Sequence, residues 1–69
     1  MAGEHTLAEQ VAWLRTAQRN REASIRRHTK DADATTDWKA VAAAIPAYAP
    51  GWVTDEAKRE YLRINGISE

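Results

Sequence analysis

Apolar residues in the first part of the chain recur at the spacing of an α-helix. Those that fall within one narrow sector of a helical wheel are Leu7, Val11, Leu14 and Ile25. Thr6 and Glu9 have the spacing of a capping box, in which each side chain accepts a hydrogen bond from the other residue's backbone amide. We therefore predict a first helix over about residues 7–30. Gln18 and Arg21 interrupt the apolar sector, so the second half of this helix should be less buried than the first.

Helix caps and a proline delimit the rest of the chain. Thr36 or Asp37 can cap a second helix, and Pro46 ends it because proline disfavours helical geometry in the residue before it. Thr54 can cap a third helix. The residues between Pro46 and Thr54 are too apolar for a solvated tether, which predicts an ordered loop. The predicted elements are a second helix over about 37–45, a loop over 46–54 and a third helix over about 55–65.

The absence of cysteine limits how such a short chain can be stabilised. With 69 residues and no Cys, the chain has room for one domain and cannot use disulfides or zinc–thiolate sites. We predict an all-α fold: residues 1–69 form a single small domain in which the long first helix packs on two shorter helices, with an ordered aromatic loop closing the core. The predicted core residues are Leu7, Val11, Leu14, Ile25, Trp38, Val41, Ile45, Tyr48, Trp52, Tyr61 and Ile64.

Positive charge is concentrated in the first predicted helix. The whole chain has ten Lys and Arg against ten Asp and Glu, whereas residues 15–30 hold six cations and a single acid, Glu22. Arginine donates to phosphate in a planar fork, and each neutralised phosphate releases counterions. We therefore predict a small non-enzymatic regulator that contacts the phosphate backbone of DNA or RNA. The candidate contacts are Arg15, Arg19, Arg26, Arg27 and Lys30.

The polar residues around these cations add little to the choice of nucleic acid. Gln18 and Asn20 could reach base edges, but nothing in the sequence selects them over other polar residues. The third predicted helix is a poorer candidate for nucleic-acid binding than the first. It begins with Asp55 and Glu56, and these carboxylates would repel phosphates.

The basic run is equally compatible with a solvated helix face. Glu22 and Arg26 have the i, i+4 spacing of an ion pair on one helix. Positive residues in the last turns of a helix are also favourable because they lie near the negative end of the helix dipole. A helix face of this kind needs no partner.

Aromatic residues suggest a second class of function. The candidate interface residues are Trp13, Tyr48 and Trp52, and Trp13 lies off the apolar face of the first helix. Exposed aromatic side chains are typical anchors at protein interfaces. The alternative function is therefore a protein-binding adaptor or inhibitor, of the kind common in phages and mobile elements, that docks on a host protein or on another copy of itself. Alternatively, the loop folds over the first helix so that Trp13 and Trp52 complete the core, and this arrangement is favoured because small domains need large side chains to reach adequate burial.

Sequence motifs for catalysis or cofactor binding are missing. The sequence contains no G-x-S-x-G, P-loop or G-x-G-x-x-G pattern, and a chain of this length has little room for a pocket that would shift catalytic pKa values. We therefore expect no enzymatic activity, no cofactor and no small-molecule substrate. Residues 31–37 resemble the start of a calcium loop, but Thr36 and Ala42 replace the required glycine and glutamate. We expect no metal site.

Hydrophobic segments that could direct the chain to a membrane are also missing from the sequence. The longest apolar run, residues 40–45, is far shorter than the ~20 residues that cross a bilayer. Residues 1–4 carry no basic region and precede no apolar stretch, so we expect no secretory signal. The sequence therefore predicts a cytoplasmic protein without a membrane partner.

Overall fold

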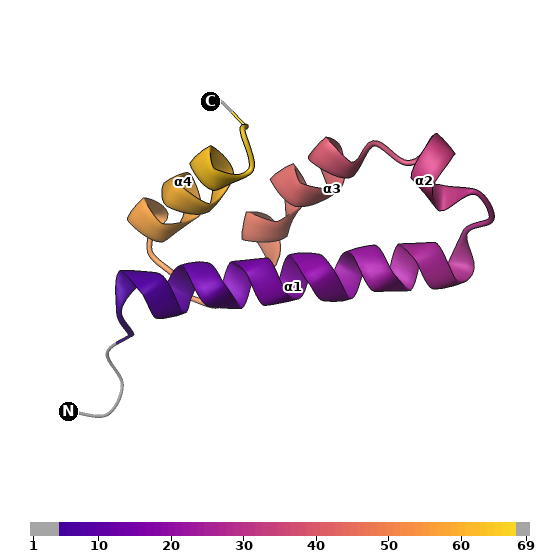
Figure 1. Ribbon diagram of the computed structural model, residues 1–69. Helices are drawn as coiled ribbons and strands as arrows, with labels where there is room; N and C mark the ends of the chain where they lie inside the picture. The colour runs from indigo at the N-terminus through magenta and orange to yellow at the C-terminus, as the bar shows by residue number, and fades with distance from the viewer. Residues whose placement is uncertain (1–4, 68–69) are drawn as a thin grey trace.

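The protein consists of one long helix covered on one side by shorter ones (Figure 1). The computed structural model describes residues 5–67. Its elements are α1 (Leu7–His28), α2 (Ala32–Thr35), α3 (Trp38–Ala44), the 3₁₀-helix η1 (Ile45–Tyr48) and α4 (Asp55–Ile64). No strand is present in that range. The all-α class, with a long first helix packed on shorter helices, is therefore confirmed.

The segment after α1 contains structure that was not expected. α1 ends at His28, because Thr29 is extended, two residues before the expected boundary near residue 30. Asp31 then adopts a left-handed conformation with a φ of 60°, which turns the chain back over α1. The four-residue helix α2 follows, and it buries Ala32. The segment between the first and second predicted helices therefore contributes a buried residue, Ala32.

The expected loop over residues 46–54 begins with a helical turn. Pro46 ends the α-helical hydrogen bonding of α3, but the chain continues as η1 because a proline at the start of a 3₁₀-helix lacks only an amide that needs no partner there. The rest of the segment returns the chain to α4, and Val53 within it is buried. The loop closes the core through Val53 rather than through its aromatic residues.

The core is smaller than the sequence predicts. Its buried residues come from α1, from η1, from the loop and from α4: Val11, Leu14, Ile45, Val53, Ala57 and Tyr61. Other residues of the predicted core are exposed, namely Leu7, Tyr48, Trp52 and Ile64. Those assignments were wrong. Apolar spacing shows which residues share a helix face, but a face is buried only where another element covers it, and the ends of α1 and α4 extend beyond that cover.

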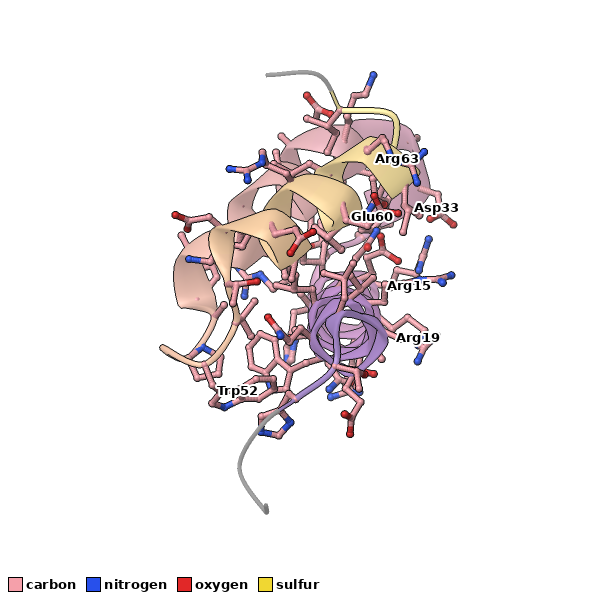
Figure 2. All side chains as sticks on the ribbon, turned by 90° about the vertical axis from the view of Figure 1, so that its left-hand side faces the viewer. Arg15, Arg19, Asp33, Trp52, Glu60 and Arg63 are labelled. Atoms are coloured by element: carbon pink, nitrogen blue, oxygen red, sulfur yellow. The ribbon has the colours of Figure 1, made fainter. Side chains whose placement is uncertain are left out.

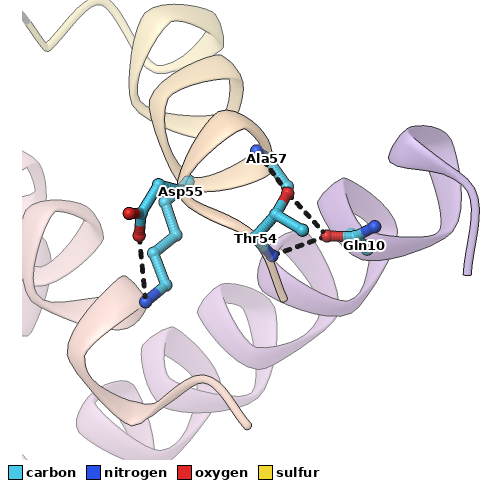
Figure 3. A network of polar contacts seen from close by, with 5 residues as sticks. Gln10, Thr54, Asp55 and Ala57 are labelled. Atoms are coloured by element: carbon cyan, nitrogen blue, oxygen red, sulfur yellow. Dashed lines mark hydrogen bonds and ion pairs between the residues drawn. The ribbon is translucent and has the colours of Figure 1, made fainter. Parts of the chain in front are cut away.

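A buried glutamine joins α1 to the start of α4 (Figure 3). The side chain of Gln10 is only 6% exposed, and its Oε1 accepts hydrogen bonds from the backbone N of Thr54 at 2.7 Å and from its hydroxyl at 3.0 Å. The same hydroxyl accepts a hydrogen bond from the backbone N of Ala57 and so caps α4. The Nε2 of Gln10 donates to the carbonyl of His5 at 2.9 Å. This network sets where α4 begins relative to α1.

Tyr61 connects the three longest helices. Its side chain is fully buried, and its hydroxyl lies 2.9 Å from Oε1 of Gln18 in α1 and 3.2 Å from the carbonyl oxygen of Ala42 in α3. Burial raises the pKa of Tyr61 from its ordinary value of 10 to about 12, and the negative charge of Glu22 adds to the effect. The phenol therefore stays protonated and keeps donating throughout the neutral range.

The hydroxyl of Thr54 is expected to contribute measurably to stability. Thr54→Val removes the cap of α4 and one donor to Gln10, and it should lower the free energy of unfolding by about 1–2 kcal/mol. Thr54→Ser keeps both hydrogen bonds and is the matched control, with an expected change within about 0.5 kcal/mol. Urea denaturation measures both values. An unchanged free energy of unfolding in Thr54→Val would show that the hydroxyl does not contribute.

The raised pKa of Tyr61 predicts that stability falls in strongly alkaline solution. The unfolded chain loses the phenolic proton near pH 10, whereas the folded chain keeps it up to about 12. The unfolded state is therefore favoured progressively as the pH rises through this interval, and the contribution is fully present below pH 10. In Tyr48→Phe, where Tyr61 is the remaining tyrosine, phenolate absorbance should rise with a midpoint near 12 when folded and near 10 in denaturant. A folded midpoint near 10 would contradict the buried hydrogen-bonded phenol.

Candidate nucleic-acid interface

The part of α1 from residue 12 onward, with Thr29 and Lys30, carries positive charge without exposed acids, and the exposed acids Glu9 and Asp31 lie just before and just after it. Between residues 12 and 30, six exposed residues are cations and no exposed residue is an acid. The exposed residues are Ala12, Arg15, Thr16, Arg19, Asn20, Arg21, Ala23, Arg26, Arg27, His28, Thr29 and Lys30. Glu22, the one acid in this range, is half-buried and accepts a hydrogen bond from Nε2 of Gln18 at 3.1 Å. We call this set the basic face.

Arginines of the basic face project from different sides of α1. Figure 2, viewed nearly along α1, shows Arg15 and Arg19 on one flank of the helix and Trp52 beyond the opposite flank. Residues advance by about 100° each in an α-helix, so Arg27 lies about 80° further round than Arg19, on the side turned away from the other helices. Nη2 of Arg19 is 3.4 Å from the hydroxyl of Thr16. The cations therefore flank an open helix surface.

Most of these cations have no acidic partner within residues 5–67. The ion pairs found there are Arg26–Asp33, Lys58–Asp55 and Arg63–Glu60. Arg15, Arg19, Arg27 and Lys30 are absent from these pairs, and all four are exposed. Their positive charges face solvent and can pair with an anion from another molecule.

Arg26 differs from the other predicted contacts. Its Nε donates to Oδ1 of Asp33 in α2 at 3.0 Å, and its guanidinium lies 4.4 Å from the ring centroid of Trp38 in α3. The expected Arg26–Glu22 ion pair is not formed, because α2 brings Asp33 to Arg26 and Glu22 bonds to Gln18. Arg26 therefore holds α2 and α3 against α1, and Asp33 offsets part of its charge.

The two polar residues considered for base contacts have different environments. Gln18 is held inside the fold, since its Nε2 also donates to Oδ1 of Asn65 at 3.1 Å and its Oε1 lies 2.9 Å from the hydroxyl of Tyr61. Asn20 is exposed on α1. Arg21, which is not among the predicted contacts, is exposed as well. Arg21 interrupts the apolar sector of α1, and this interruption in the sequence indicates that the second half of the helix is less buried by other elements than the first half.

The predicted aromatic interface is not continuous. Trp52 is 38% exposed, stacks on His5 with ring centroids 4.0 Å apart, and meets the half-buried Trp13 edge-on at 6.3 Å. Tyr48 is separate from this pair and 71% exposed. It borders a shallow groove whose lining also includes Ala17, Asn20, Arg21 and Ile45. Trp13 and Trp52 are thus largely occupied with the fold and with each other, and Tyr48 is the most exposed aromatic of the three.

A second shallow groove lies between the start of α1 and α4. Its lining residues are Leu7, Ala8, Val11, Ala12, Arg15, Glu60 and Ile64. Two hydrogen bonds from Arg63 hold the Glu60 carboxylate and keep its pKa below the ordinary value.

None of the helices in residues 5–67 combines the length and the apolar character needed to cross a membrane. The same part of the chain contains no cluster of three His, Cys, Asp or Glu suited to a metal ion.

Arg26 is expected to affect stability more than the neighbouring Arg27. Arg26→Ala removes a surface ion pair and a cation–π contact, which together contribute about 1 kcal/mol to stability. It should also increase hydrogen exchange at the backbone amides of residues 34–36, which lie in the last turn of α2 and at its C-cap. Arg27→Ala removes the same charge from the next position and should change stability by less than about 0.5 kcal/mol. Hydrogen exchange read by mass spectrometry compares the two variants. Equal exchange in both would mean that Arg26 does not hold α2.

Comparisons with known proteins give no family or relative for this chain. No family model matches it, and neither the curated proteins nor the solved structures yield a match.

Proposed function

We propose that the protein is a small non-enzymatic regulator that binds nucleic acid through the basic face of α1. The observation that carries the proposal is the charge of this surface. Its exposed residues include six cations and no acid, although the chain as a whole is neutral. One of the six, Arg21, lies toward the covered side of α1 in a groove with Ile45 and Tyr48, so the outer surface depends on the other five. A field of one sign on one face attracts a polyanion without requiring a positive net charge.

The individual cations have distinct parts in this proposal. Arg15 and Arg19 lie one turn apart on one flank of α1, about 6 Å along the helix axis. Each guanidinium can donate two hydrogen bonds to one phosphate. Arg27 lies about 12 Å further along than Arg19. Lys30 extends the positive surface beyond the end of α1. Arg26 contributes less, because Asp33 already pairs with it.

The other surfaces of the molecule support the same choice. α4 begins with the exposed carboxylates of Asp55 and Glu56, which would repel phosphates at its N-terminus. The covering helices all lie on the opposite side of α1 from its outer surface (Figure 1). A polyanion can therefore approach the outer side of α1 and comes beside α4 only at Arg15, which shares a groove with Glu60.

Salt dependence tests the proposal. Binding of a fluorescently labelled nucleic acid, measured by anisotropy at increasing salt, should weaken steeply. The double variant Arg15→Ala/Arg19→Ala should bind about 100-fold more weakly at ~0.1 M salt, and its log–log salt slope should be smaller by about 2, since each lost phosphate contact removes about 0.9 from the slope. The matched control is Lys39→Ala/Arg59→Ala, which removes two exposed cations from α3 and α4. If both double variants lose affinity equally, the basic face is not the binding surface.

A second candidate function is binding to another protein, and the exposure of Tyr48 favours it. A phenol that is 71% exposed beside a shallow groove is an available aromatic anchor. The nucleic-acid proposal ranks first because it uses several unpaired charges and not a single ring. Tyr48→Ser separates the two functions, since it should leave nucleic-acid affinity unchanged and abolish binding to a protein partner.

A further inference from the structure

We infer that the nucleic acid is double-helical DNA and that the outer surface of α1 enters its major groove. This inference rests on the proposed function and adds the class of ligand and the mode of contact. Three features of α1 lead to it: its projection from the molecule, the size of its outer side chains and the placement of its cations.

The first feature is that one side of α1 is not covered by any other helix along its length. α2, α3 and α4 lie on one side of it (Figure 1), and the view along α1 shows its opposite side open to solvent (Figure 2). An α-helix with its side chains is about 10–12 Å wide, and the major groove of B-form DNA is about 12 Å wide and 8.5 Å deep. The outer half of α1 therefore has the width that this groove admits.

The second feature is the size of the side chains at the centre of the outer surface. Ala12, Thr16 and Ala23 fall within about 40° of one another on the helical wheel, and all three are exposed. Small side chains on this line let the helix backbone approach the floor of a groove. A row of long side chains there would hold α1 away from the bases.

The third feature is that the long cations stand on both sides of this line of small residues. Arg15 and Arg19 lie on one flank and Arg27 on the other, at the angles set by about 100° per residue. Phosphates border the major groove on both sides, so a helix within it needs cations on both flanks. A helix lying on a single strand needs them on only one.

The two amides of this part of α1 lie away from the centre of the outer surface. Asn20 is exposed, whereas Gln18 is bound to Tyr61, Glu22 and Asn65 inside the fold. Asn20 lies beyond Arg27, about 60° from the line of small residues, and it borders the groove beside Tyr48. Neither amide therefore faces the floor of the groove, and we assign no base contact to either.

These features distinguish DNA from RNA. The major groove of an A-form RNA duplex is deep and narrow and does not admit side chains from a helix of this width. A single strand has no groove at all. A protein that only neutralises phosphates would bind all three kinds of nucleic acid, whereas insertion of α1 requires the B-form duplex.

The test measures the affinity of the intact protein for a set of labelled probes of matched sequence and length. The probes are a DNA duplex, an RNA duplex, a DNA single strand and a DNA duplex whose cytosines carry glucosylated hydroxymethyl groups, which fill the major groove. The DNA duplex should bind at least tenfold more tightly than each of the other three. Netropsin, which occupies the minor groove, should change the affinity less than twofold.

A pair of variants tests the same point from the side of the protein. Ala23→Leu places a bulky side chain at the centre of the outer surface and should weaken duplex binding at least tenfold. Ala43→Leu makes the same change at an exposed position of α3 and should have no effect. Circular dichroism confirms that each variant keeps its helices.

The outcomes separate the inference from the proposed function. Equal affinity for DNA and RNA duplexes, lost in Arg15→Ala/Arg19→Ala, would overturn groove insertion and retain phosphate binding by the basic face. Full binding to the glucosylated duplex, or wild-type binding by Ala23→Leu, would have the same meaning. Absence of binding to every probe would overturn both.

Discussion

The hydroxyl of Tyr61 is the contact on which the arrangement of the helices depends. It joins α4 to Gln18 of α1 and to the backbone of α3 at Ala42, in a molecule whose buried cluster contains only a few side chains. A core this small buries limited apolar surface and supplies limited stability. A polar contact shared by three helices therefore has a large influence on how they pack, and it also commits Gln18 to the interior.

Because the shorter helices pack on one side of α1, the opposite side of that helix does not contribute to the hydrophobic core. The polar and charged residues there make few contacts with the rest of the chain, and between residues 12 and 30 none of the exposed residues is an acid. Arg26 is the exception, since it joins α1 to Asp33 and Trp38. The fold thus separates a face that builds the core from a face that is free to meet another molecule, and it does so along a single helix.

Sequence patterns succeeded where structure depends on neighbours along the chain. The capping box of Thr6 and Glu9 and the caps by Asp37 and Thr54 are all present, because a cap is made by residues three positions apart. Patterns failed where burial depends on distant segments. Leu7 and Ile64 share helix faces with core residues yet remain exposed, since no element extends over the ends of α1 and α4. For the candidate site, the sequence showed which residues are charged, but it did not show that Asp33 pairs with Arg26.

The order of the residues by itself determined that the chain is helical, where its main helices begin and that positive charge gathers on the first of them. These properties follow from backbone hydrogen bonding and side-chain spacing within a few turns. Only the tertiary structure decided that Gln18 lies inside and Asn20 outside, that Arg26 is paired while Arg15, Arg19 and Arg27 have no acidic partner among the described residues, and that Tyr48 projects into solvent. Which side of a helix is covered depends on how segments far apart in the chain pack together, and local spacing carries no information about that packing.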